Sequence, residues 1–163
     1  MINQKYKDAT NDYRGCKSVL LVKDTKTMVV ARRGSDAPKA PGEVDLPGGR
    51  SEEGESPYDT GRRECIEEIG IDINDSRIIS TDAVMAPYGE YLWLMLIEIT
   101  PELAEEASAV TEMSDVWIED IDTYLQRDDA WVPFQLHAHK LLLEAGLTSL
   151  KPDYSRLDAR GRS

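Results

Sequence analysis

The most informative part of the chain reads Gly49-Arg-Ser-Glu-Glu-Gly-Glu55-Ser-Pro-Tyr-Asp-Thr-Gly-Arg-Arg63-Glu64-Cys65-Ile66-Glu67-Glu68-Ile69-Gly70-Ile71. Three carboxylates in it, Glu64, Glu67 and Glu68, stand at helical positions i, i+3 and i+4, so a helix places them on one face about 5–6 Å apart. Like charges at this spacing destabilise a helix unless a positive charge lies among them. Mg²⁺ binds such carboxylates together with substrate phosphates. The spacing indicates a cation site, and the alternative is a solvated acidic face.

The same stretch carries the start and stop signals of a helix. Ser56 is a good N-cap residue, Pro57 follows at the first helical position, and Gly70 is a natural stop just past Ile69. Gly61 lies in mid-helix, where it costs about 1 kcal/mol relative to alanine. Close packing against a sheet explains it, although a fortuitous glycine remains the alternative.

The spacing of these residues resembles the complete Nudix box, from Gly49 to Ile71. Cys65 stands where the family has an aliphatic residue, and a buried thiol behaves as a small hydrophobe. The resemblance implies an α/β/α sandwich with a mixed β-sheet. It also implies an enzyme that hydrolyses a pyrophosphate bond in a nucleoside diphosphate linked to another moiety. Every fixed glycine or charged position of the pattern is filled: Gly49, Glu55, Arg63, Glu64, Glu67, Glu68 and Gly70.

Pyrophosphate cleavage requires neutralisation of charge on the phosphate oxygens, which metal ions provide. We therefore expect Glu64, Glu67 and Glu68 to hold Mg²⁺ or Mn²⁺. Glu64 has a second interpretation, in which it orients or deprotonates the attacking water. In the family a later loop often adds a carboxylate, for which Glu112 is the first candidate and Asp115 the second.

Arg63 also has two interpretations. It either donates two hydrogen bonds to a substrate phosphate or pairs with Glu55 and locks the preceding loop onto the helix. In both cases we count it with the catalytic group. Glu55 and Gly70 are expected to be structural members of the box.

Substrate contacts are expected from Arg33, Gly48 and Gly49, because arginine and the N–H groups at a helix start favour phosphate. Arg33, Gly42, Val44 and the run from Leu46 to Gly49 resemble an additional motif of coenzyme A pyrophosphatases. The chain departs from that motif at three positions: Gly34 replaces a serine, Pro38 an arginine and Leu46 a phenylalanine.

The substrate stays open among nucleoside triphosphates, ADP-ribose or nucleotide sugars, and dinucleoside polyphosphates. Coenzyme A is the alternative substrate. A nucleotide-binding Nudix-fold module that does not cleave is the alternative of another class. Tyr88, Tyr91 and Trp93 are candidates for stacking on a base, with Trp93 alternatively in the core.

The whole chain has 163 residues, a formal net charge of −12 and a pI near 4.6. Nucleic-acid-binding modules usually carry a basic surface, so this composition disfavours a nucleic-acid partner and an anionic membrane surface. Cys16 and Cys65 form no disulfide framework, as expected in a reducing compartment. The N-terminus lacks an apolar signal core, and the run Tyr91–Ile97 is too short to span a bilayer. These features predict a cytoplasmic protein whose partner is a small-molecule nucleoside diphosphate derivative.

One Nudix domain is expected over residues 16–147, after a polar lead-in at 1–15 and before a polar tail at 148–163. The tail is either mobile or a contact of a possible homodimer. Strands are predicted at Cys16–Val22, Thr27–Ala31, Arg77–Val84, Tyr91–Ile99 and Val116–Ile118. Besides the helix of the box, a helical turn is predicted at Glu119–Gln126 and an amphipathic helix at Pro133–Ala145.

Overall fold

The computed structural model describes residues 13–85 and 89–157. Its strands are β1 (Gly15–Val22), β2 (Thr27–Arg33), β3 (Val44–Asp45), β4 (Gly48–Arg50), β5 (Arg77–Met85), β6 (Tyr91–Ile99) and β7 (Met113–Asp120). Its helices are α2 (Pro57–Ile69), α3 (Pro101–Glu105), α4 (Ile121–Leu125) and α5 (Val132–Glu144), followed by a 3-10 turn, η1 (Tyr154–Arg156). Every strand and helix expected from the sequence is present. The short elements β3, β4 and α3 had no prediction of their own.

The strands form one mixed sheet, with the order β3-β2-β1-β6-β5 along its main path. β1 runs parallel to β6 and antiparallel to β2 and β4, so it is the central strand of the fold. β7 pairs antiparallel with β2. The mixed β-sheet expected from the sequence is therefore confirmed.

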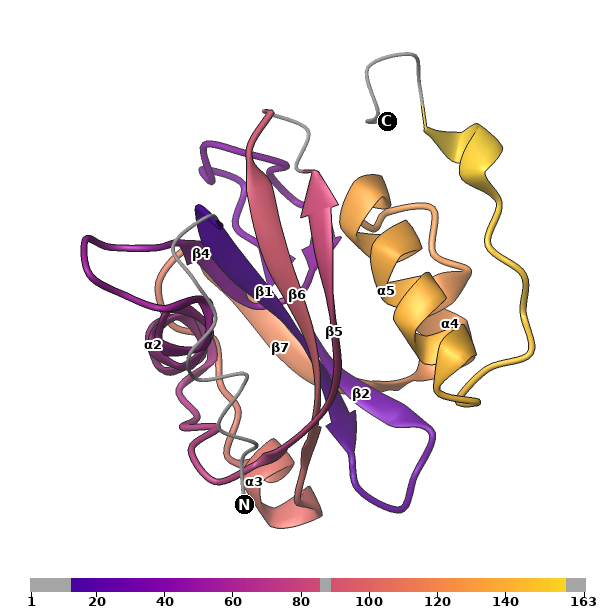
Figure 1. The fold of residues 1–163 in the computed structure, drawn as a ribbon, viewed down its shortest axis with the longest axis horizontal. Helices are drawn as coiled ribbons and strands as arrows, with labels where there is room; N and C mark the ends of the chain where they lie inside the picture. The colour runs from indigo at the N-terminus through magenta and orange to yellow at the C-terminus, as the bar shows by residue number, and fades with distance from the viewer. Residues whose placement is uncertain (1–12, 86–88, 158–163) are drawn as a thin grey trace.

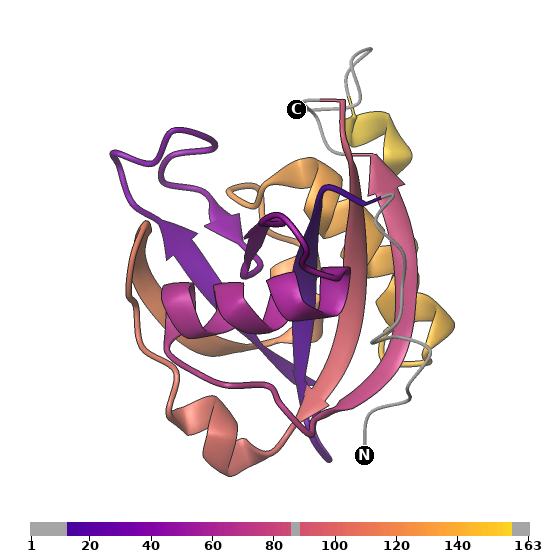
Figure 2. The same ribbon diagram turned by 60° about the vertical axis from the view of Figure 1, so that its left-hand side comes forward.

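Helices cover both faces of this sheet. Figure 1 shows α2 on one side of the strands and α4 with α5 on the other, and Figure 2 shows α2 crossing in front of the central strands. Alternate residues of β1 feed the two cores: Leu20 and Val22 pack on the α2 side, whereas Val19 and Leu21 pack on the α5 side. This period of two is the alternation of side chains in a strand. The α/β/α sandwich is confirmed.

β7 is longer than the strand that the sequence predicted at Val116–Ile118. It pairs only with β2 among the described strands, so it lies at an edge of the sheet. Most of its side chains are exposed or half-buried, including Ser114 and Asp115. Because an edge strand is partly exposed, it needs no continuous apolar run. The hydrophobic pattern therefore predicted only the central part of β7.

The helix α2 begins and ends as its sequence indicates. The Ser56 hydroxyl accepts a hydrogen bond from the Asp59 N–H at 3.1 Å, and the Asp59 side chain completes a capping box. Gly70 ends the helix in the left-handed conformation, with φ 72°. Gly61 packs against the sheet, because a Cβ there would lie 2.5 Å from Met95 Cε and 3.0 Å from Cys16 Sγ.

The segment after α5 lies along the body of the domain as far as the structure describes it. Leu147 and Leu150 pack against the core on the α5 side. The Leu150 carbonyl lies 2.8 Å from His139 Nε2, and Thr148 Oγ1 donates to Asp122 at 2.6 Å. The domain boundaries at residues 15/16 and 147/148, and the homodimer, stay predictions.

Across the described ranges, no helix is both long and apolar enough to cross a membrane.

A larger side chain at Gly61 should separate α2 from the sheet. Because a valine side chain would have to displace the buried Met95 and Cys16 side chains, we expect Gly61→Val to destabilise the domain by about 1–3 kcal/mol, the usual range for overpacking. Thermal unfolding followed by circular dichroism measures this. Ile66→Val is the matched control, since Ile66 lies on the same helix with 45% of its surface exposed. Equal stability of the two variants would contradict the packing role of Gly61.

Candidate active site

A cleft of about 310 Å³ opens where α2 meets the glycine loop and the end of β2. We call the box glutamates its acidic wall, and its basic side chains together with a tryptophan its basic wall. The residues that line it are Lys17, Arg33, Pro38, Lys39, Gly48, Gly49, Arg50, Glu64, Glu67, Glu68, Thr111, Glu112 and Trp131. The structure thus brings Arg33, both glycines, the three box glutamates and Glu112 into one cleft, although they are distant in sequence.

The glycine loop is fitted directly to the helix α2. The Gly48 N–H donates to Glu68 Oε1 at 2.7 Å, and β4 pairs with β1. A Cβ at Gly49 would lie 2.5 Å from Glu64 Oε1, so only glycine lets the Glu64 carboxylate lie against the loop. The loop and the helix are therefore one unit, and the glycines are needed for their close approach.

Burial dominates the electrostatics of the two inner glutamates. Only 3% of Glu68 is exposed, and this desolvation raises its pKa to about 8, against the opposing effects of Lys17 and the Gly48 N–H. Burial also raises the pKa of Glu64, while Arg63 opposes the rise. A carboxylate in such a place is stabilised in its ionised form by any cation that enters the cleft.

Arg63 lies behind this wall and does not line the cleft. Its Nε and Nη2 donate to the two carboxylate oxygens of Glu55 at 2.8 and 3.0 Å. Nη1 donates to Glu64 and Glu67 at 3.1 Å each, and Nη2 also donates to the Arg50 carbonyl at 2.9 Å. The structure therefore agrees with the second interpretation of Arg63, in which it pairs with Glu55.

The basic wall is organised by a buried aspartate, Asp45, that the sequence analysis did not single out. Asp45 Oδ2 accepts from Lys17 Nζ at 2.6 Å and from Arg33 Nη1 at 3.3 Å, and its Oδ1 accepts from the Leu46 N–H at 2.8 Å. Arg33 Nη2 reaches Glu112 at 3.4 Å. Asp45 therefore holds two cationic side chains at the cleft.

Trp131 reaches the cleft through a short pairing of two distant segments. The Val44 N–H donates to the Asp129 carbonyl at 2.8 Å, and the Trp131 N–H donates to the Val44 carbonyl at 2.9 Å. The indole then lies beside both cations, with Lys17 Nζ 5.2 Å and the Arg33 guanidinium carbon 5.5 Å from its ring centre.

Several candidates from the sequence lie elsewhere. Tyr91 is exposed, and Trp93 is buried in the core on the α2 side. Asp115 accepts from its neighbour's N–H on β7. Tyr88 lies outside the described residues, and among those described the aromatic side chain that lines the cleft is Trp131.

The sequence contains a feature that could have identified Lys17 and Asp45 as buried, paired residues. Lys17 interrupts the apolar run of β1, and Asp45 stands between Val44 and Leu46. Charged residues at such positions are buried only when paired. Trp131 had no comparable signal, because its place depends on the pairing with Val44.

Within the described part of the chain, no three His, Cys, Asp or Glu side chains converge closely enough to hold a metal ion as they stand. Glu64 and Glu67 are turned toward Arg63, and Glu68 toward the Gly48 N–H. The donor set nevertheless suits Mg²⁺ or Mn²⁺, because these ions prefer carboxylate oxygens. Glu68 in particular is buried at the cleft with no basic side chain bonded to it among the hydrogen bonds described.

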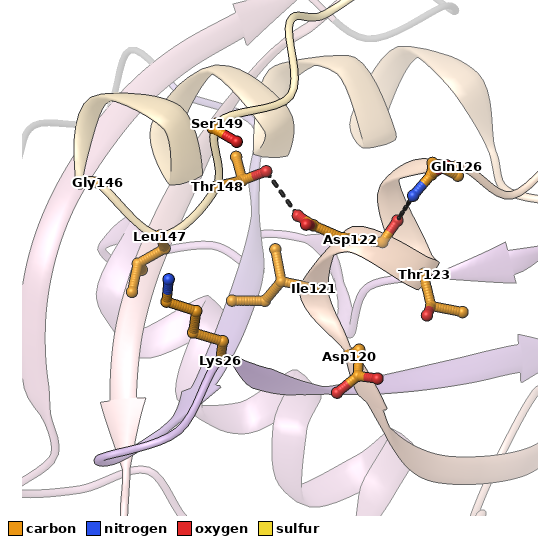
Figure 3. Close-up of a pocket in the computed structure, with 10 residues that line it drawn as sticks. All are labelled: Lys26, Asp120, Ile121, Asp122, Thr123, Gln126, Gly146, Leu147, Thr148 and Ser149. Atoms are coloured by element: carbon orange, nitrogen blue, oxygen red, sulfur yellow. Dashed lines mark hydrogen bonds between the residues drawn. The ribbon is translucent and has the colours of Figure 1, made fainter.

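A second cleft, of about 400 Å³, lies between the β1–β2 turn, α4 and the segment after α5 (Figure 3). Lys26 points into it, and Asp122 accepts hydrogen bonds from Thr148 and, through its carbonyl, from Gln126. It shares no residue with the cleft of the box glutamates. It has no glycine loop, and its charged residues are one lysine and two aspartates.

The family of the chain follows from a comparison with protein-family models. The model of the NUDIX domain matches residues 13–140. The chain therefore belongs to the Nudix family, and it is a Nudix pyrophosphohydrolase. No curated protein gave a match.

Solved structures with the same fold are numerous. A MutT protein from Methanosarcina mazei is 16% identical, with a TM-score of 0.66 over 82% of this chain and 95% of that one. An Ap4A hydrolase from C. elegans is 14% identical, with a TM-score of 0.64 over 81% of this chain and 99% of that one. A bifunctional NMN adenylyltransferase/ADP ribose pyrophosphatase from Francisella tularensis, complexed with AMP and a Mn ion, is 19% identical, with a TM-score of 0.62. The match covers 85% of this chain but only 43% of that enzyme.

The pair of Arg63 and Glu55 should contribute measurably to stability. Both side chains are mostly buried, with 21% and 17% exposed, so their hydrogen bonds are poorly screened. In a double-mutant cycle of Arg63→Met and Glu55→Gln, we expect a coupling energy of about 1–2 kcal/mol in urea unfolding.

The chain offers a matched control for this cycle. Arg62 makes a pair of the same geometry with Asp72, at 2.8 and 2.9 Å, but 40% and 45% of these side chains are exposed. We expect the cycle of Arg62→Met and Asp72→Asn to give about 0.5 kcal/mol or less. Equal coupling in the two cycles would contradict a special role for Arg63 in locking the loop.

Proposed function

We propose that the protein is a metal-dependent pyrophosphohydrolase that cleaves a nucleoside diphosphate linked to another moiety. The observation that supports this most directly is the buried carboxylate of Glu68 at the cleft, where the glycine loop meets α2. Glu64 and Glu67 flank it on the same wall. Basic side chains that line the same cleft suit the phosphates of such a substrate.

We propose Glu64, Glu67 and Glu68 as ligands of Mg²⁺ or Mn²⁺, with Glu112 as an additional ligand. The metal, when bound, neutralises charge on the phosphate oxygens and lowers the pKa of a coordinated water. Glu112 belongs to this set because it lines the same cleft, where its carboxylate is held by Arg33 at 3.4 Å. Glu64 is the alternative group to orient the attacking water.

The remaining box residues position this machinery. Arg63 holds Glu55, Glu64 and Glu67 together, so its contribution to catalysis is to orient carboxylates. The Gly48 N–H is already bonded to Glu68. Gly49 acts by leaving room for Glu64. Arg33 is the proposed phosphate contact, since its guanidinium lines the cleft and is fixed by Asp45.

Coenzyme A remains an alternative substrate with less support. Pro38 lines the cleft at the position where the motif of the coenzyme A enzymes has an arginine. Proline offers no donor to a phosphate. The named relatives act on different nucleotide derivatives, an Ap4A hydrolase and an ADP ribose pyrophosphatase among them. Their substrates provide a panel for testing this protein. We propose that residues outside the box select among these substrates.

If Glu68 binds the metal, Glu68→Gln should lower kcat with Mg²⁺ or Mn²⁺ by at least about 100-fold, because the charge that holds the ion is lost. The fold should survive, since the glutamine carbonyl can still accept the Gly48 N–H. Phosphate release across the panel measures the activity, and calorimetric titration with Mn²⁺ measures the loss of metal affinity.

The control for this experiment is Glu53→Gln, which removes one charge from an exposed glutamate of the box loop. It should keep the parent rate and the parent metal affinity. A Glu68→Gln protein with unchanged turnover and unchanged Mn²⁺ binding would overturn the ligand assignment.

A further inference from the structure

We propose that Thr111 is a positioning residue of the active site. Its hydroxyl holds residues 108–112 on the end of α2 and so places the Glu112 carboxylate beside the box glutamates. We call residues 108–112, which belong to the connection between α3 and β7, the clasp. The inference rests on the proposed function, in which Glu112 is a metal ligand. It gives a role to Thr111, a residue of the cleft lining that the proposed function does not use.

The clasp completes the hydrogen bonding of the last turn of α2. The last carbonyl groups of an α-helix have no partners within the helix and need donors from elsewhere. The Gly70 N–H donates to the first of them, the Ile66 carbonyl, at 3.1 Å. The clasp supplies donors for the next three carbonyls, namely Thr111 Oγ1 to Glu67 at 3.0 Å, the Val110 N–H to Glu68 at 2.9 Å and the Ser108 N–H to Ile69 at 2.9 Å. Figure 2 shows the connection between α3 and β7 passing this end of α2.

Thr111 differs from the other two donors of the clasp because it donates through its side chain. The amides of Ser108 and Val110 belong to the backbone, so substitution of a side chain leaves them in place. The Thr111 hydroxyl is also the donor next in sequence to Glu112. Valine has the shape of threonine without the hydroxyl, so Thr111→Val removes this bond selectively.

The backbone of Glu112 adopts a conformation that its surroundings must hold. Its φ is 56°, in the left-handed region, which costs free energy for residues other than glycine. Its carbonyl accepts from the Gly34 N–H at 2.7 Å, just after β2, and Met113 then pairs with Arg33 of β2. The turn at Glu112 is therefore fixed by β2 on one side and by the Thr111 bond to α2 on the other.

The Glu112 side chain depends on this turn for its place. Because 51% of it is exposed, packing does not fix it, and the bond described for its carboxylate is the one from Arg33 at 3.4 Å. Glu67 lies within α2, where the hydrogen bonds of the helix and the packing of Gly61 hold the backbone. Loss of the Thr111 hydroxyl therefore displaces Glu112 and leaves the helix glutamates where they are.

The test is a double-mutant cycle on metal affinity, measured by calorimetric titration with Mn²⁺, which needs no turnover. We expect Glu112→Gln to weaken Mn²⁺ binding about tenfold, because a charged ligand is lost. Thr111→Val should weaken it about fivefold, because groups that orient ligands affect metal affinity nearly as much as the ligands do. The double variant should lose about tenfold, whereas independent effects would give about fiftyfold.

Two further variants separate positioning from stability. Thr111→Ser keeps the hydroxyl and should bind Mn²⁺ within about twofold of the parent. Thr25→Val is the matched control, since Thr25 is also exposed and its Oγ1 donates to the Val22 carbonyl at 2.7 Å, in the turn between β1 and β2. Urea unfolding should show similar losses of stability in Thr111→Val and Thr25→Val. Only Thr111→Val should lose Mn²⁺ affinity.

Two results would overturn the inference and leave the proposed function standing. One is a Thr111→Val protein that binds Mn²⁺ as the parent does while Glu112→Gln binds it more weakly. The other is a pair of effects that multiply in the double variant, which would make Thr111 a contact independent of Glu112. A parent that neither binds Mn²⁺ nor releases phosphate from any substrate of the panel would overturn the proposed function, and this inference with it.

Discussion

The hydrogen bond from the Gly48 N–H to the Glu68 carboxylate is the contact on which the cleft depends. It joins α2 to the glycine loop, and β4 joins that loop to the central strand β1. A carboxylate this deeply buried is costly unless its charge is met by donors or cations, which is why its pKa rises to about 8. The same contact brings Glu64 against Gly49, so the glutamates of the box have their places only while the loop is held.

Asp45 has the corresponding role on the other wall. It links β3 to Lys17 of β1 and to Arg33 of β2, and Val44 beside it pairs with the segment that carries Trp131. Breaking one partner of such a buried pair usually costs several kcal/mol, because a charge is left without compensation. Lys17 bonds to Asp45, and its charge also opposes the rise in the pKa of Glu68.

The part of the site that the sequence could predict is the part encoded locally. The N-cap at Ser56, the stop at Gly70 and the i, i+3, i+4 spacing of the glutamates all act within a few turns of chain, so α2 was recognisable from sequence alone. The wall of Lys17, Asp45 and Trp131 depends on pairings between strands far apart in sequence. Local periodicity contains no information about such pairings, beyond the oddity of a charge inside an apolar run.

The division between local and non-local encoding has a functional consequence. The charged residues of the box already have partners within the protein: Arg63 forms ion pairs with three glutamates, and Glu68 accepts a hydrogen bond from the glycine loop. These contacts leave the box residues little freedom to distinguish one nucleotide derivative from another. The other residues that line the cleft come from β1, β2, the β2–β3 connection, β4, the α3–β7 connection and the segment before α5. Connections of this kind tolerate change better than the elements they join. A fixed box is therefore compatible with different substrates, because the residues that surround it in the cleft are free to differ.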